Sequence, residues 1–249
     1  MQIVVSNLLT NYKIFPSPKS KENILILHGW QNNLTIWEKT SYELSKSINV
    51  ILVDLPGFGQ TQIPPDSWDI FDYANFVETF IKKLSLDNLT IAGHSFGGRI
   101  ALILGTKAKI CKKVILIDSA GLPIKDFKSK FLLTAIGFGK PIIKILPKPL
   151  SKIIFDFVGS SDYKMAKELL PTFKKIVLTD LTEHAKKIKI PTLILWGDRD
   201  EILPITHAKK FKELIPHATL RIVWGAGHSP HTEKPEKFLE IVTEFLEQN

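Results

Sequence analysis

A serine stands in the middle of the segment Gly93–Gly97, which reads Gly-His-Ser-Phe-Gly. The apolar run 89–92 before it predicts a buried strand, and the run 99–104 after it, with its Ala and Leu residues, predicts a helix. A sharp strand-to-helix turn crowds the positions two residues before and two residues after its apex, and glycine relieves that crowding. The segment therefore predicts a nucleophile elbow, which exposes the Ser95 hydroxyl and directs the Phe96 amide at the group that this hydroxyl attacks.

A nucleophilic serine also needs a base and an orienting carboxylate, because a free hydroxyl is almost wholly protonated at neutral pH. Both are expected after the elbow, in the order serine, acid, histidine. A predicted strand at 220–223 leads into a glycine-rich loop, which brings His228 to the same edge of the sheet as Ser95. Earlier in the chain, an apolar strand leads into a polar turn that offers Asp198 and Asp200, and Asp200 is the preferred acid.

These motifs resemble those of the α/β-hydrolase family, and the likeness extends over nearly the whole chain. In that family the acid is the aspartate of a Gly-x-x-Asp turn followed by an apolar pair and a proline. Segment 197–204 matches this pattern with Asp200 as the acid and Asp198 as a turn residue. The family's histidine lies in a Gly-x-Gly-His loop, which matches residues 225–228. The resemblance therefore implies that Asp200 orients His228 as the base for the elbow serine.

Two alternatives remain open for these roles. His231 stands three residues after His228 and is the alternative base, although it lies closer to the start of the helix expected at 234–236. Some members of the resembling family place the acid after the strand that follows the elbow helix, which would make Asp118 the acid. The other interpretation of Asp118 is a polar residue at the end of a strand.

Acyl transfer develops negative charge on an oxygen, and each backbone amide that stabilises it lowers the barrier by about 3 to 4 kcal/mol. Besides the Phe96 amide, the resemblance implies the amide of Trp30 as a second donor, in the loop after a strand that begins at Asn23. His28 and His94 are candidate substrate contacts near these donors. His28 is expected mainly to shape its loop, and the His94 side chain is expected to lean away from the reacting centre.

Strand and helix signals alternate along most of the 249 residues. Longer runs such as 69–84 and 206–214 predict helices. The expected strands include 50–53, 89–92, 114–117, 192–196 and 220–223. This alternation predicts an α/β fold, with a mostly parallel central sheet and helices on both faces. At 44% hydrophobic residues the chain can bury a large core, and we expect one catalytic domain formed by residues 1–121 and 190–249.

The interval 122–189 departs from this alternation, since it shows helical patches separated by prolines and no convincing strand. The resemblance implies an inserted helical cap at this place, a lid that excludes water and selects substrates. Its underside is expected to carry apolar side chains, with Phe131 and Phe138 as candidate substrate contacts. Most of the large apolar residues in the interval are nevertheless expected to hold the cap together.

Positive charge is concentrated in the same interval. Residues 122–189 contain 14 lysines and 6 acidic residues, and the surplus of +8 equals the formal net charge of the whole chain. A solvated lysine-rich surface is the simplest explanation, because lysine greatly outnumbers arginine throughout the sequence. A surface that steers an acidic carrier and contact with a membrane surface are the other interpretations. The sequence has no recognised nucleic-acid-binding motif, so no nucleic-acid partner is expected.

Together these residues predict a serine hydrolase that cleaves a carboxylic ester, a small-molecule substrate, through an acyl-enzyme on Ser95. A serine at the elbow argues against the aspartate-nucleophile dehalogenases and epoxide hydrolases of the resembling family. Lactonases, thioesterases and carbon-carbon bond hydrolases remain alternatives, as does an esterase that demethylates an ester on an acyl carrier protein. A hydrolase-fold receptor that binds a ligand without turnover is the alternative from another class.

No cofactor is expected for this chemistry, and the sequence suggests no metal site. Cys111 is the one cysteine, which excludes a disulfide within the chain. Residues 1–12 lack the basic start and apolar core of a signal peptide, and no apolar run approaches the ~20 residues of a membrane span. We therefore expect a cytoplasmic monomer or weak homo-oligomer.

Overall fold

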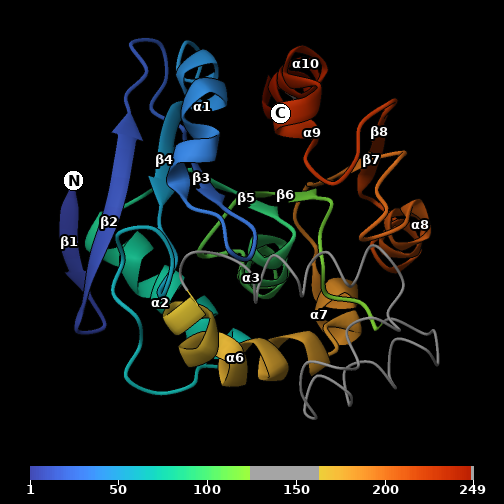
Figure 1. Ribbon diagram of the computed structural model, residues 1–249. Helices are drawn as coiled ribbons and strands as arrows, with labels where there is room; N and C mark the ends of the chain where they lie inside the picture. Colours follow the sequence, from blue (N-terminus) through green and yellow to red (C-terminus); the bar gives the residue numbers. More distant parts are fainter. Residues whose placement is uncertain (124–162, 248–249) are drawn as a thin grey trace.

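The computed structural model describes residues 1–123 and 163–247, and within them eight strands form one sheet (Figure 1). The strand order is β1-β2-β4-β3-β5-β6-β7-β8. The strands are β1 (Gln2–Val5), β2 (Leu8–Phe15), β3 (Asn23–Leu27), β4 (Asn49–Val53), β5 (Leu89–His94), β6 (Lys113–Ile117), β7 (Thr192–Gly197) and β8 (Thr219–Val223). The helices in these residues are η1 (Leu34–Trp37), α1 (Glu38–Leu44), α2 (Ile70–Lys83), α3 (Phe96–Leu104), α6 (Tyr163–Leu178), α7 (Thr182–Lys187), α8 (Ile205–Leu214), α9 (Pro230–Glu233) and α10 (Pro235–Glu247).

The sheet is mostly parallel, as the alternation of strand and helix signals predicts. Strands β3 to β8 pair in parallel with one another, whereas β1 pairs antiparallel with β2 and β2 antiparallel with β4. The hairpin of β1 and β2 was not predicted. Its two turn residues, Ser6 and Asn7, have φ values of 49° and 64°, a left-handed conformation that two-residue hairpin turns use. The predicted α/β fold class is confirmed.

The register of the parallel strands brings several loops to one edge of the sheet. Leu27 at the end of β3 pairs with Gly93 in β5, and His94 pairs with Ile117 at the end of β6. Strands β7 and β8 continue the same parallel order. Because the carboxyl ends of parallel strands meet at one edge, the loops after β3, β5, β7 and β8 converge there.

Helices cover both faces of the sheet (Figure 1). On one face, α1 and α10 pack over a cluster that includes Trp37 and Phe238. On the other face, α2, α3 and α8 pack over a larger cluster that includes Phe76 and Phe211. The central strands are therefore buried on both sides, which explains why their sequences are continuous apolar runs rather than alternating ones.

Helix α2 is a good example of a helix specified by its own sequence. Asp69 accepts hydrogen bonds from the amides of Phe71 and Asp72, and the Asp72 side chain accepts from the Asp69 amide. This reciprocal capping box satisfies amides that have no acceptor inside the helix. One face of the helix then buries apolar residues such as Phe76 and Phe80 against the sheet.

Helices α6 and α7 fall in the interval expected to form the cap. Phe131 and Phe138, the candidate substrate contacts of that interval, lie outside the described residues. The Trp68 amide donates to Thr172 Oγ1 at 3.1 Å, and Lys175 Nζ donates to the Ser67 carbonyl at 2.5 Å, which attaches α6 to the loop before α2. Within the described ranges, no helix has the length and apolar character needed to cross a membrane.

Arg99 joins α6 to the helix that follows the elbow. Its side chain extends from α3, and Nη1 donates to the Thr179 carbonyl at 2.9 Å. Burial lowers the pKa of Arg99 to about 10, an effect opposed by the nearby Asp180 carboxylate. Carbonyl groups at the C-terminal end of a helix lack intrahelical donors. Arg99 therefore supplies a charged donor just after α6 and ties that helix to α3.

We expect Arg99→Met to lower the free energy of unfolding by about 2 kcal/mol, because a partly buried carbonyl loses its charged donor. Urea titration measures this change. Arg221→Met is the matched control, since Arg221 forms an exposed ion pair with Glu244 at 3.5 Å, and such a pair contributes about 1 kcal/mol or less. Equal losses in the two variants would contradict the role given to Arg99.

Candidate active site

Ser95 lies between β5 and α3, at the apex of the predicted turn. Its backbone has φ 50° and ψ −107°, a conformation that residues with a side chain rarely adopt. The Ser95 amide donates to the Ile117 carbonyl at 3.0 Å. The Ser95 carbonyl accepts from the amides of Gly98 and Ala120, each at 3.1 Å. Hydrogen bonds to β6, to the loop after it and to α3 thus hold the strained apex in place.

The crowding expected around the elbow is present at both glycines. A Cβ atom on Gly93 would clash with the Gly97 carbonyl, and a Cβ atom on Gly97 would clash with the Leu27 carbonyl at the end of β3. The Gly97 amide also donates to the His28 carbonyl at 3.2 Å. Glycine at these positions lets α3 begin directly against the loop that follows β3.

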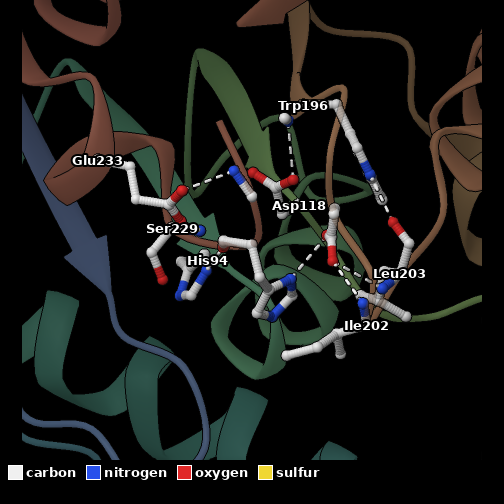
Figure 2. Close-up of polar contacts among 11 residues, drawn as sticks. His94, Asp118, Trp196, Ile202, Leu203, Ser229 and Glu233 are labelled. Carbon is white, nitrogen blue, oxygen red and sulfur yellow. Dashed lines mark hydrogen bonds and ion pairs between the residues drawn. The ribbon is translucent and has the colours of Figure 1, made fainter. Parts of the chain in front are cut away.

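His228 and Asp200 form a close pair at the carboxyl edge of the sheet. His228 Nδ1 lies 2.7 Å from Asp200 Oδ2, with the Asp200 side chain fully buried and the His228 side chain 16% exposed. Asp200 Oδ1 accepts from the amides of Ile202 and Leu203, at 2.8 and 2.9 Å (Figure 2). Because a carboxylate only accepts, the neutral ring carries its proton on Nδ1. The lone pair of Nε2 is then left to act as a base.

His94 connects the elbow strand to the loop that carries His228. His94 Nε2 donates to the His228 carbonyl at 2.7 Å, and the two rings lie 5.0 Å apart. Burial lowers the pKa of His94 well below its ordinary value, and the nearby His228 lowers it further. His94 is therefore a neutral donor, and its bond joins the residue before Ser95 to the residue expected to be the base.

The alternatives considered for the base and the turn residue have other surroundings. His231 stacks on Trp37 with ring centroids 3.7 Å apart, and burial lowers the pKa of His231 to about 3. Asp198 accepts from the Gly225 amide and so joins the turn after β7 to the loop after β8. The geometry favours His228 as the base and a structural role for Asp198.

Asp118, the alternative acid, is buried next to the pair. Its Oδ1 accepts from the Gly197 amide at 2.9 Å (Figure 2). One oxygen of Asp118, one oxygen of Asp200 and one ring nitrogen of His228 lie within 4.8 Å of one another. The His228 ring nevertheless makes its hydrogen bond with Asp200, so the geometry favours Asp200 as the acid.

His28 is part of the loop structure. Its Nδ1 donates to the Gly29 carbonyl at 2.7 Å, and its Nε2 accepts from the Leu55 amide at 3.0 Å. Burial lowers the pKa of His28 to about 4, against the opposing effects of the Gly29 carbonyl and the Asp54 carboxylate. Both ring nitrogens of this buried side chain therefore form hydrogen bonds with the backbone of the loops after β3 and β4. The geometry therefore does not support His28 as a substrate contact, and His94 is likewise engaged with the backbone.

Trp30 packs against the start of α3. Its ring lies edge-on to Phe96 with centroids 5.2 Å apart and edge-on to Phe58 at 4.8 Å. As the first residue of α3, Phe96 has an amide with no acceptor inside the helix. The packing brings the two residues expected to supply the oxyanion donors next to each other.

The sequence matches the family described as "Alpha/beta hydrolase family" over residues 24–241, which is most of the chain. The chain belongs to the alpha/beta hydrolase family. The matched range contains the elbow, the Asp200 turn and the His228 loop.

Similar proteins share this fold over most of their length. AB hydrolase superfamily protein YisY of Bacillus subtilis is 29% identical over 246 residues, which cover 89% of this chain and 90% of that protein. Monoacylglycerol lipase ABHD6 of Bos taurus is 24% identical over 269 residues, covering 94% of this chain and 78% of the lipase. The crystal structure of a membrane phospholipase A has a TM-score of 0.82 and 25% identity, covering 99% of this chain and 84% of that one.

In this alpha/beta hydrolase, an aromatic cluster that the sequence did not predict lies beside the expected oxyanion donors. Phe58 follows β4 and Phe173 belongs to α6, and both contact Trp30, at 4.8 and 5.2 Å between ring centroids. Tyr73 of α2 packs edge-on against Phe96 at 5.0 Å. Apolar rings keep water away, which strengthens hydrogen bonds to a developing charge. Phe173 belongs to the interval expected to be the cap, but its helical spacing alone could not indicate a contact with Trp30.

If Asp200 is the acid, Asp200→Asn should lower kcat by on the order of 10³ to 10⁴, because an amide no longer favours the ring tautomer with its proton on Nδ1. Asp198→Asn is the matched control, since its amide oxygen can still accept from Gly225. We expect it to cost less than about tenfold. Steady-state hydrolysis of a short activated ester measures both, and a larger loss for Asp198→Asn would reassign the acid.

His94→Leu removes the donor to the partly buried His228 carbonyl and should lower kcat by about tenfold, because an unsatisfied carbonyl costs about 1–3 kcal/mol and loosens the loop. His94→Gln keeps an N–H donor and should lose less. The comparison uses kcat for an activated ester and thermal unfolding of both variants. Indistinguishable kcat values in two equally stable variants would exclude a positioning role for this hydrogen bond.

Proposed function

We propose that this hydrolase cleaves a carboxylic ester through a covalent acyl-enzyme on Ser95. The observation that carries the proposal is the 2.7 Å contact between His228 Nδ1 and Asp200 Oδ2. The second support is the strained backbone of Ser95, with φ 50°, as expected for a nucleophile elbow. A serine hydroxyl is a weak nucleophile by itself, and an oriented histidine supplies the base that it needs.

In the first step, Ser95 Oγ attacks the ester carbonyl carbon while His228 Nε2 takes the hydroxyl proton. The carbonyl oxygen becomes negative, and the amides of Trp30 and Phe96 stabilise it. Asp200 stabilises the imidazolium that forms on His228. The tetrahedral intermediate then breaks the ester C–O bond, and His228 returns its proton to the leaving alcohol.

In the second step, water replaces the alcohol. His228 Nε2 takes a proton from this water as its oxygen attacks the acyl carbon, and the same amides hold the second oxyanion. The bond to Ser95 Oγ then breaks, and His228 gives the proton back to the serine. Ester and water are converted into acid and alcohol, and the enzyme returns to its starting state without a cofactor.

Two observations support an ester with an apolar acyl chain. The cluster of Phe58, Phe96 and Phe173 around Trp30 offers apolar surface beside the expected oxyanion donors. The names of two similar proteins, a monoacylglycerol lipase and a membrane phospholipase A, both refer to enzymes that act on lipids. An acyl chain in contact with these rings would add binding energy of roughly 0.8 kcal/mol per buried CH₂ group.

The same groups would also serve a lactone, a thioester or a carbon-carbon bond substrate, because each requires attack on a carbonyl carbon. An ester linked to an acidic carrier protein is a further candidate, supported by the lysine surplus of residues 122–189. A ligand receptor with this fold would bind without turnover. A panel of esters graded by acyl length, with matched lactones and thioesters, distinguishes these possibilities.

We expect Ser95→Ala to lower hydrolysis of a short activated ester by on the order of 10⁴ or more, because no other group replaces the nucleophile. The variant should stay folded, since the Ser95 backbone rather than its hydroxyl makes the hydrogen bonds at the elbow. A phosphonylating probe should label the wild-type protein at Ser95 and leave the variant unlabelled. Full turnover by a pure Ser95→Ala protein would eliminate the serine mechanism, and an unlabelled wild-type protein would favour a receptor.

A further inference from the structure

Two buried carboxyl groups lie side by side behind His228. Asp118 has no exposed surface, and the side chain of Asp200 is fully buried as well. Asp118 belongs to the end of β6 and Asp200 to the turn after β7, and these two strands pair in parallel. One side-chain oxygen of each residue lies within 4.8 Å of one oxygen of the other. Two ionised carboxylates buried this close together would repel one another, which favours a proton on one of the two groups.

The hydrogen bonds to the two groups are unequal. Asp200 accepts from two backbone amides and from His228, so donors meet both of its oxygens. Asp118 accepts from the Gly197 amide through Oδ1, and no donor within the described residues reaches its buried Oδ2. Donors stabilise the ionised form of a carboxyl group, and burial without donors disfavours it. The proton therefore belongs on Asp118.

The charges around the pair favour the same assignment. In the described part of the chain, no lysine or arginine forms an ion pair with either carboxyl group. Glu233 of α9 is near Asp118 and adds negative charge. Burial raises the pKa of Asp118 well above its ordinary value, and the charges of Asp200 and Glu233 raise it further. The neighbouring rings of His94 and His231 are neutral, because burial lowers the pKa of each.

We propose that Asp118 holds a proton at neutral pH and donates a hydrogen bond to the Asp200 carboxylate, so that it is a positioning residue acting on His228 through Asp200. The inference rests on the proposed role of His228 as a base. A second negative charge beside Asp200 would stabilise the imidazolium and remove the free base at neutral pH. A neutral donor has the opposite effect, since it draws electron density from Asp200 and leaves His228 able to accept the serine proton.

The protonation state can be measured without any turnover. The infrared difference spectrum of wild type minus Asp118→Asn at neutral pH should contain the carbonyl stretch of a protonated carboxylic acid. The same difference for Asp198→Asn is the control, and it should contain only carboxylate bands, because Asp198 is partly exposed and accepts from the Gly225 amide. Absence of the acid band in the Asp118 difference would overturn the proposal while leaving the serine hydrolase function intact.

The functional effect is tested by the pH dependence of kcat/KM for an activated ester. Asp118→Asn keeps an acceptor for Gly197 and a donor for Asp200, so the acidic limb of the profile should move by less than about 0.3 pH unit. Asp118→Ala removes the donor, makes Asp200 a better partner for the imidazolium, and should move the limb to higher pH by about half a unit or more. In both variants kcat falls, and the alanine variant should lose several-fold more.

Opposite shifts would contradict the proposal. If Asp118 is ionised in the native protein, Asp118→Asn removes a negative charge beside His228, and the acidic limb should move to lower pH by about one unit. A purely structural role would lower kcat in both variants and leave the limb unmoved. Should Asp118→Ala fail to fold, Asp118→Asn and the infrared difference still decide the question. If the wild-type protein hydrolyses no ester, the proposed function is refuted. The infrared difference would still decide whether Asp118 is protonated.

Discussion

The arrangement of the site depends on how closely α3 approaches the end of β3. That approach is possible because Gly97 has no side chain where a Cβ atom would meet the Leu27 carbonyl. The Ser95 backbone must then adopt φ 50°, a conformation that costs of order 1–3 kcal/mol. The surrounding sheet supplies the hydrogen bonds that hold it. A bulkier residue at position 97 would displace Ser95 and the Phe96 amide together, because both belong to the same turn.

The electrostatics of the site follow from burial more than from ion pairs. His28, His94 and His231 are buried, and burial lowers the pKa of each, so they surround the site as neutral rings. A positive charge on any of them would oppose formation of the imidazolium on His228. The His228 side chain keeps 16% exposure and has a carboxylate partner. Among these four rings, His228 thus combines partial exposure with a carboxylate partner.

Sequence patterns predicted the parts of the protein that short-range rules determine. The parallel strands are continuous apolar runs. The elbow is a contiguous segment in which glycine is required because a Cβ atom at these positions would clash with neighbouring backbone. The hairpin of β1 and β2 was missed because its strands lack a strong apolar pattern, and half of β1 is exposed. The contacts of His94 with His228 and of Phe173 with Trp30 join residues far apart in the sequence. Only the folded chain brings such pairs together, so residue type and spacing could not predict them.

Helix α3 begins just after Ser95 and carries Arg99, whose guanidinium donates a hydrogen bond to the Thr179 carbonyl just after α6. This bond has a consequence for exchanging the segment that ends near Thr179 with the corresponding segment of a relative. A graft that ends before Thr179 keeps the native hydrogen bond between Arg99 and the Thr179 carbonyl. The new residues are then still attached to α3 through Thr179. A graft that extends past Thr179 leaves a guanidinium buried without its acceptor unless the incoming chain supplies a carbonyl at the same place. The boundary of a transferable segment is thus set by one arginine in the core rather than by the limits of a helix.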